Sequence, residues 1–201
     1  MEKKSEIILI IGRRGCGKTT LAKDFIKDKN RLIILDTMKE YNIGYLADKY
    51  IDFAKYVYKN RYNDYMKVSY YPTEKSIKAV FDVICDMLWE MSNITFVIEE
   101  LARFMNSKSY PESFDRLTRA SRHKCINIYG ITQRAVDIPV LLRSQSNKIC
   151  TFQQIEVADV NYLKQLFDAT DIKKIRNFDK FEYLEYLDNG EKTVKRFKPK
   201  F

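Results

Sequence analysis

The sequence has a single histidine, His123, and only four cysteines among its 201 residues. The cysteines are widely scattered without a C-x-x-C pair, so neither a zinc site nor a disulfide framework is indicated. One histidine also excludes a metal site built from several imidazoles. The apolar run near the start, residues 7–11, is far shorter than the ~20 residues of a spanning helix or the ~7–15 of a signal core. We therefore expect no membrane partner and a cytoplasmic location.

The composition is that of a globular chain with a basic excess. Hydrophobic residues make up 45% and charged residues 31%, which is not the balance of a disordered chain. Lys plus Arg total 36 against 27 Asp plus Glu, a net charge of +9. That charge favours a polyanionic partner, nucleic acid first, although a generic basic surface would give the same excess. No repeat or linker divides the chain, so we expect one domain over 1–201, with a core over 6–153 and a C-terminal helix and hairpin over 154–201.

Short apolar segments alternate with stretches of helical periodicity along the chain. Strands are predicted at 7–11, 32–35, 67–71, 95–98, 125–131 and 148–152. Helices are predicted at 20–29, 73–91 (capped by Thr73) and 113–121, with helix and loop over 45–65. Asn189-Gly190 between two strand-like runs, 181–187 and 192–197, predicts a hairpin. The alternation implies a three-layer α/β fold with a mostly parallel central sheet.

The segment after the first predicted strand, GRRGCGKT at 12–19, matches the phosphate-binding P-loop pattern G-x-x-x-x-G-K-[ST] and precedes a predicted helix. Its glycines let backbone N–H groups turn toward phosphates, and the helix N-terminus adds partial positive charge. Lys18 is expected to reach the β- and γ-phosphates of ATP, and the Thr19 hydroxyl to ligate Mg²⁺. The residues expected to contact the nucleotide are Gly12, Arg13, Arg14, Gly15, Cys16, Gly17, Lys18, Thr19 and Thr20. A glycine-rich turn without a ligand is the alternative.

Polar side chains end two further predicted strands. ITFVIEE at 94–100 closes on two carboxylates, of which Glu99 would hold the magnesium shell and Glu100 would act as general base on water. CINIYGITQ at 125–133 ends in Gln133, which would sense the γ-phosphate or position the water. Ordinary polar strand ends are the alternative. With the P-loop, these residues predict an ATPase site in a three-layer P-loop NTPase of the ASCE or RecA-like kind.

Two arginines precede the last of these strands, within TRASRHK at 118–124. They are expected at the opposite end of that strand from the nucleotide of the same subunit, so they are poorly placed to act in cis. In a ring, that edge can face a neighbour's ATP, where an arginine can act as a finger in trans. We favour Arg122 over Arg119 for this role, against the alternative of solvated surface arginines.

The order of these motifs resembles that of the FtsK/HerA superfamily of DNA-translocating ATPases, which includes viral genome-packaging ATPases. LDTMKEY at 35–41 is similar to the D-P-x-G-E-Y stretch of HerA-like proteins, with Thr37 and Lys39 in place of Pro and Gly. After IEE at 98–100, TQRAVDIP at 132–139 resembles the T-Q-R-P…D-[IV] segment. The resemblance spans about residues 7–152 and not the C-terminal quarter.

This resemblance implies an ATP- and Mg²⁺-dependent motor on double-stranded DNA, assembled as a ring of five or six copies, with a capsid or portal protein as a further candidate partner. It also places the trans finger at Arg122. Small size without an appended barrel favours a viral packaging ATPase, acting in the host cytoplasm, over a cellular HerA-like translocase. Two departures stand out: Glu99 replaces the more usual Asp, and Arg13-Arg14 occupy P-loop positions that are more often small or neutral.

Candidate DNA contacts come from two further segments. YVYKNRYNDYMK at 56–67 interleaves tyrosines for stacking with cations for phosphates, among them Lys59 and Arg61. The loop-like stretch 103–113 offers Lys108. An ordinary helix with solvated lysines is the alternative for the first segment, and the basic end at 192–200 is equally a DNA-facing or a solvated tail. Two other classes stay open for the whole chain: a nucleotide kinase, although no Arg-rich lid is identified, and a nucleotide-dependent switch protein.

Overall fold

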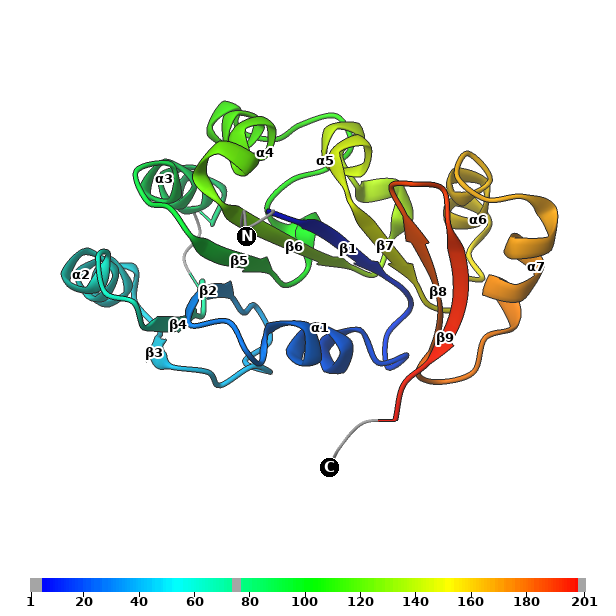
Figure 1. Ribbon diagram of the computed structural model, residues 1–201, viewed down its shortest axis with the longest axis horizontal. Helices are drawn as coiled ribbons and strands as arrows, with labels where there is room; N and C mark the ends of the chain where they lie inside the picture. The colour runs from blue at the N-terminus through cyan, green and yellow to red at the C-terminus, as the bar shows by residue number, and fades with distance from the viewer. Residues whose placement is uncertain (1–4, 74–76, 199–201) are drawn as a thin grey trace.

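The computed structural model of the protein describes residues 5–73 and 77–198, and within them nine strands form one sheet (Figure 1). The strand order is β3-β4-β2-β5-β6-β1-β7-β8-β9. All pairs from β3 to β7 are parallel, and β8 and β9 extend the sheet antiparallel as a hairpin. The strands are β1 (Ile7–Ile11), β2 (Arg31–Leu35), β3 (Tyr45–Ala47), β4 (Met66–Tyr70), β5 (Ile94–Ile98), β6 (Ile126–Thr132), β7 (Lys148–Thr151), β8 (Glu182–Leu187) and β9 (Lys192–Arg196).

Helices cover the two faces of this sheet unequally. The helices are α1 (Lys18–Ile26), α2 (Tyr50–Asn60), α3 (Ile77–Trp89), α4 (Glu112–Lys124), α5 (Val140–Gln145), α6 (Val157–Leu163) and α7 (Ala169–Asn177), with 3₁₀ turns η1 (Leu101–Arg103) and η2 (Ala135–Asp137). Figure 1 shows α3, α4 and α5 on one face and α1 on the other. The expected three layers with a mostly parallel sheet and a C-terminal hairpin are therefore confirmed.

Strand β1 shows why the sheet lies in the middle layer. All five of its residues are buried, and their side chains alternate between the two faces. Ile8 and Ile10 pack in the cluster under α1, whereas Ile7, Leu9 and Ile11 pack in the larger cluster under α3 and α4. A continuous apolar run is what a parallel strand covered on both faces requires.

The strand order decides where functional side chains meet. Strand β6 lies between β1, which leads into the P-loop, and β5, which leads into Glu99. Because β1, β2, β5, β6 and β7 run parallel, their last residues lie at one edge, here called the carboxyl edge. The opposite edge, where these strands begin, is the amino edge.

The predicted elements differ from the structure mainly outside the central strands. The stretch 45–65 also contains β3, a three-residue edge strand whose Tyr45 and Leu46 are exposed, so it has little hydrophobic pattern. The C-terminal part holds two helices, α6 and α7, where one was expected. The proposed cap at Thr73 adjoins residues 74–76, which lie outside the described part of the chain. No helix in the described ranges is long and apolar enough to cross a membrane.

Candidate nucleotide site at the carboxyl edge

The P-loop leaves β1 and passes directly into α1. The Gly12 N–H donates to the carbonyl of Thr132 at 3.2 Å, which ties the start of the loop to the end of β6. Gly15 and Gly17 have φ angles of 78° and 112°, which glycine adopts without steric cost. Gly17 caps α1 without any side-chain hydrogen bond, so the first N–H groups of the helix keep no side-chain acceptor. A helix start of this kind is suited to binding an anion.

Lys18 lies within the loop rather than in solvent. Its side chain is buried, and Nζ donates to the carbonyl oxygen of Arg13 at 3.1 Å. Phosphate oxygens would be stronger acceptors for this ammonium group than a neutral carbonyl. Burial also raises the pKa of the neighbouring Cys16 thiol, although the charge of Lys18 opposes the shift.

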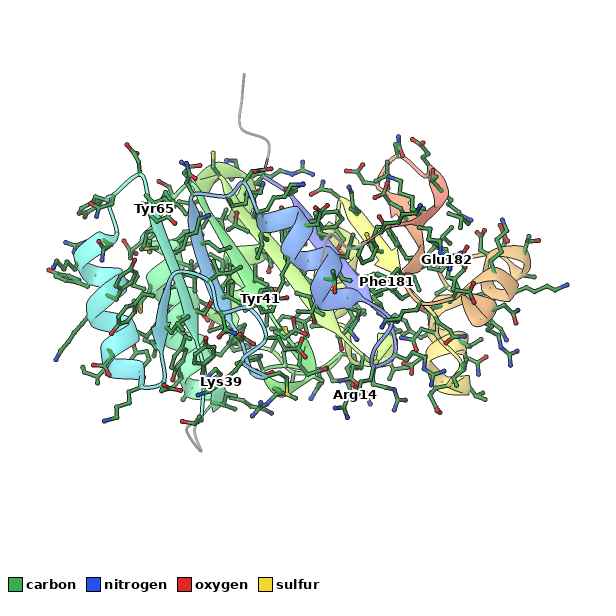
Figure 2. All side chains as sticks on the ribbon, turned by 90° about the horizontal axis from the view of Figure 1, so that it is seen from below. Arg14, Lys39, Tyr41, Tyr65, Phe181 and Glu182 are labelled. Atoms are coloured by element: carbon green, nitrogen blue, oxygen red, sulfur yellow. The ribbon has the colours of Figure 1, made fainter. Side chains whose placement is uncertain are left out.

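The structure separates the two loop arginines, both of which were expected to contact the nucleotide. Arg13 Nη1 donates to Oε1 of Gln153 at 3.2 Å, so this side chain is tied to the segment after β7. Arg14 is exposed, and no hydrogen bond or ion pair joins it to any residue the structure describes. Figure 2 shows Arg14 at the carboxyl edge, pointing away from the sheet. Arg14 is therefore the P-loop cation free to meet a ligand or a neighbouring subunit.

Glu99 is a buried carboxylate next to this loop, at the end of β5. It is 6% exposed, and its Oε2 accepts a 2.6 Å hydrogen bond from the Tyr41 hydroxyl. Burial raises the pKa of Glu99 from 4.5 to about 7, and the hydrogen bond from Tyr41 and the charge of Lys18 partly oppose that shift. Lys18 and Glu99 therefore lie close enough for their charges to interact.

Tyr41 is held by the loop that follows β2. Asp36 is fully buried at the end of β2, and its carboxylate accepts the backbone N–H groups of Glu40 at 3.0 Å and Tyr41 at 2.8 Å. The carboxylate thus fixes the loop that carries the phenol to Glu99. Both residues belong to the LDTMKEY segment, but no role was predicted for either. Nothing in the neighbouring sequence indicates that Tyr41 contacts the end of β5.

Glu100 and Gln133, expected from two different strands, are in direct contact. Gln133 Nε2 donates to Oε2 of Glu100 at 2.9 Å. Glu100 adopts φ 62° and ψ 72°, a left-handed conformation in which few residues with a β-carbon are found. Strained backbone of this kind gathers at functional sites, which agrees with the expected role of Glu100.

Two residues that the sequence analysis missed hold the Gln133 segment in place. Gln154 Nε2 donates to the carbonyl of Gln133 at 2.8 Å. Asp159, fully buried on α6, accepts from Arg134 Nε at 2.7 Å and from the Val136 N–H at 3.1 Å. The C-terminal quarter therefore supports the loop after β6, although the motif resemblance ended before it.

The oxygens around the P-loop fit a magnesium ion held mainly by a nucleotide. The Thr19 hydroxyl and Oε1 of Glu99 have no hydrogen-bond partner within the described ranges. Neither atom is completely buried, so both are open to a ligand. Hard oxygen donors of this type suit Mg²⁺, which usually takes one or two protein ligands besides phosphates and waters. Accordingly, the described residues contain no group of three or more His, Cys, Asp or Glu side chains that would hold a metal alone.

The expected finger arginines lie away from this site, as predicted from their position before β6. Both are exposed on α4, and Arg122 is in its last turn, at the amino edge. Arg119 Nε pairs with Asp115 at 2.7 Å, whereas Arg122 has no hydrogen bond or ion pair with the residues described. Of the two, Arg122 is the one whose guanidinium is unengaged.

The three expected DNA contacts are not brought together in one copy. Lys59 and Arg61 lie at the end of α2, near the amino edge, and Arg61 stacks 3.8 Å from the ring centre of Tyr58. Arg61 also lines a hollow of about 530 Å³ on that side. Lys108 is exposed in the loop that follows β5. Strand β5 ends at the carboxyl edge, so this loop starts from that edge. A DNA path touching all three would need contacts with more than one edge.

Comparisons with known proteins agree on the fold. No protein-family model and no curated protein matches the chain. Among solved structures, the genome packaging NTPase B204 from Sulfolobus turreted icosahedral virus 2, in complex with sulfate, has a TM-score of 0.77 and 19% identity, covering 98% of this chain and 99% of that one. B204, the DNA-packaging ATPase from Sulfolobus turreted icosahedral virus, has a TM-score of 0.76 and 21% identity, covering 98% of this chain and 100% of that one. VirB4 of Thermoanaerobacter pseudethanolicus has a TM-score of 0.71 and 10% identity, covering 95% of this chain and 89% of that one. The motif resemblance is thus confirmed at the level of the fold, and this chain has the P-loop NTPase fold of the viral genome-packaging ATPases.

Proposed function

We propose that this protein is an ATPase that hydrolyses ATP to ADP and phosphate. The observation that carries the proposal is the meeting of Lys18, Glu99 and the Glu100–Gln133 pair at one edge of the sheet. Solved complexes of the similar B204 protein with ATP-gammaS and AMPPCP support nucleoside triphosphate as the ligand. A kinase site would need no such paired carboxylates.

Each side chain has a distinct part in the proposed reaction. Lys18 would exchange the Arg13 carbonyl for the β- and γ-phosphates, and Glu100 would accept the proton of the attacking water. Gln133, already hydrogen-bonded to Glu100, would orient that water. Thr19 and Glu99 would hold Mg²⁺, which when bound neutralises the charge of the phosphates. The remaining P-loop residues, Gly12 to Thr20, would surround the phosphate chain.

We further propose that hydrolysis drives movement of double-stranded DNA through a homo-oligomeric ring, as in viral genome packaging. The net charge of +9 and the DNA-packaging ATPase among the similar structures support this reading. In a ring, Arg122 at the amino edge would complete the neighbour's site. The continuous sheet supports treating residues 1–201 as one ATPase domain, and a cellular HerA-like translocase is the nearest alternative.

Phosphate release with and without double-stranded DNA, at several salt concentrations, tests the function. Translocation predicts stimulation by DNA that weakens as salt rises, because phosphate contacts release counterions. Transfer of the γ-phosphate to a small acceptor would identify a nucleotide kinase instead. Nucleotide binding without turnover in the assembled, DNA-bound protein would identify a switch protein.

A further inference from the structure

Two half-buried phenyl rings from the C-terminal part of the chain lie against the P-loop. A β-carbon placed on Gly17 would stand 2.5 Å from Cδ1 of Phe181 and 3.3 Å from Cζ of Phe197. The two rings meet edge to face, with centres 5.1 Å apart. Figure 2 shows Phe181 beside α1. Rings that touch the phosphate-binding loop are placed to touch a ligand of that loop.

Main-chain hydrogen bonds fix this aromatic pair on the loop. The Phe181 N–H donates to the carbonyl of Cys16 at 2.9 Å, and the Phe197 N–H donates to the carbonyl of Phe181 at 3.2 Å. Phe181 has a φ of 68°, a left-handed conformation that is an outlier for a bulky side chain. Strain of this kind persists where the surroundings enforce it, and ligand clamps are among those places.

Core packing alone does not account for these rings. Phe152 and Tyr183, which contact the same aromatic group, are 0% and 5% exposed and complete the cluster under α1. Phe197 packs against this cluster, yet both it and Phe181 remain partly exposed. The exposed Lys180 lies over the Phe181 ring, with Nζ 5.0 Å from the ring centre. A solvated lysine can move aside, so a flat ligand could occupy its place on the ring.

The catalytic carboxylates set the direction in which a nucleotide crosses the P-loop. Glu99 and Glu100 follow β5, which lies beyond β6 on one side of β1, so the terminal phosphate belongs on that side. The nucleoside then extends toward the other side of β1, where β7 and β8 lie. Phe181 immediately precedes β8. Resting on the proposed ATPase function, we propose that Phe181 and Phe197 form the platform on which the nucleobase of the bound triphosphate stacks.

This platform would select nucleotides over bare polyphosphate. Stacking uses the π-face that every base has, so it adds affinity without strong choice among bases. ATP and GTP should therefore lose affinity together when the rings are removed. Tripolyphosphate, which has no base, should not be affected.

Calorimetric titration of the full chain with ATP, GTP and tripolyphosphate, each with Mg²⁺, tests the platform. Phe181→Leu and Phe197→Leu keep an apolar side chain but lose the π-face, and Phe181→Trp keeps it. We expect each Leu variant to weaken ATP and GTP binding about five- to tenfold with tripolyphosphate unchanged, and Phe181→Trp to bind like wild type. Tyr186→Leu, on β8 but packed against Phe167, is the matched control and should bind all three as wild type does.

Two results would overturn the platform. Unchanged ATP binding in both Leu variants would show that no base rests on the rings. Equal loss of ATP and tripolyphosphate would show that the rings only keep the P-loop in shape. If Phe181→Leu does not fold, Phe197→Leu still tests the platform. Phe197 has no positive φ, so its backbone is not strained in the same way. Failure of the ATPase proposal is distinguishable, because wild-type protein could then bind ATP in this titration and still release no phosphate from it.

Discussion

The phenol of Tyr41 donates a 2.6 Å hydrogen bond to Oε2 of Glu99, joining the loop after β2 to the end of β5. The contact is buried, and Asp36 fixes the backbone on the tyrosine side. It leaves Oε1 of Glu99 without a hydrogen-bond partner among the described residues. In the proposed site, the Tyr41 hydroxyl positions the carboxylate through Oε2, and Oε1 would be the oxygen available to Mg²⁺.

Replacing Tyr41 with Phe should impair metal-dependent turnover more than nucleotide binding. The change removes one hydrogen bond to a charged group, worth about 1.5–3 kcal/mol, so we expect about ten- to a hundredfold weaker activation by Mg²⁺. The measurement is phosphate release as a function of Mg²⁺ concentration. Tyr71→Phe is the matched control, because its hydroxyl donates to Asn42 in the same loop region without touching Glu99. Equal effects of the two variants would remove the special role of Tyr41.

The raised pKa of Glu99 predicts a pH-dependent cost to the metal-free fold. Its folded-state pKa of about 7 lies above the ordinary 4.5, so the folded state holds this proton more tightly than the unfolded state. The stability from this group is therefore present below about pH 4.5 and is lost as pH rises through about 7. The full change is on the order of 3 kcal/mol, since one pKa unit equals about 1.4 kcal/mol.

Urea unfolding of wild type and Glu99→Gln at pH 5 and pH 8, without Mg²⁺, measures the pH-dependent contribution of Glu99 to the free energy of unfolding. The Gln variant has no proton to lose at this position, so it should gain stability relative to wild type at the higher pH. Added Mg²⁺ should reduce the difference at pH 8, because the ion binds the carboxylate form. A wild-type to variant difference that is the same at both pH values would contradict the assignment.

Glu100→Gln should abolish hydrolysis while leaving ATP binding intact. Loss of a general base lowers turnover by about 10²- to 10⁴-fold, and the amide can still be accommodated beside Gln133. Lys18→Ala should also abolish turnover, but with loss of nucleotide affinity, because Lys18 would hold the phosphates in the proposed site. Single-turnover hydrolysis together with nucleotide titration separates the two. Weakened ATP binding in Glu100→Gln would place Glu100 in the binding site rather than in the chemical step.

The parts of the site that the sequence predicted are those whose signal is local. The P-loop is one continuous motif at the junction of a strand and a helix, and Glu99, Glu100 and Gln133 each end an apolar strand. The parallel sheet then brings these strand ends together without further information. The hairpin at β8 and β9 was predicted for the same reason, because Asn-Gly specifies a tight turn.

The supporting contacts were not predictable, because they join segments far apart in the sequence. Asp159 reaches Arg134 across 25 positions, and Tyr41 reaches Glu99 across 58. A buried aspartate in a short helix and a tyrosine in a loop have many alternative partners until the fold is known. Phe181 against Gly17 is the same case: its sequence neighbourhood indicated only the start of a strand.

Asp159→Asn should destabilise the loop that carries Gln133. Asp159 is fully buried, whereas the Arg134 side chain is 47% exposed, so the loss is that of hydrogen bonds to a charged group, about 1.5–3 kcal/mol. We expect that loss in the free energy of unfolding, together with reduced turnover. Asp115→Asn is the control, because its pair with Arg119 is exposed and worth about 1 kcal/mol or less. Similar destabilisation by both variants would mean that burial of Asp159 has no special weight.

Arg122→Ala should stop turnover in the assembled ring without weakening ATP binding by the mutant subunit. The arginine lies at the amino edge, away from its own P-loop, so in the proposed ring it would act on a neighbour's nucleotide. Loss of an arginine finger lowers the rate by about 10³- to 10⁵-fold. Arg119→Ala, on the same helix but already paired with Asp115, is the matched control and should retain turnover.

Mixing Arg122→Ala subunits with Lys18→Ala subunits should restore part of the activity, because the intact P-loop of the first then meets the intact arginine of the second. Normal turnover in Arg122→Ala, measured in the assembled protein with DNA, would rule out this arginine as the finger.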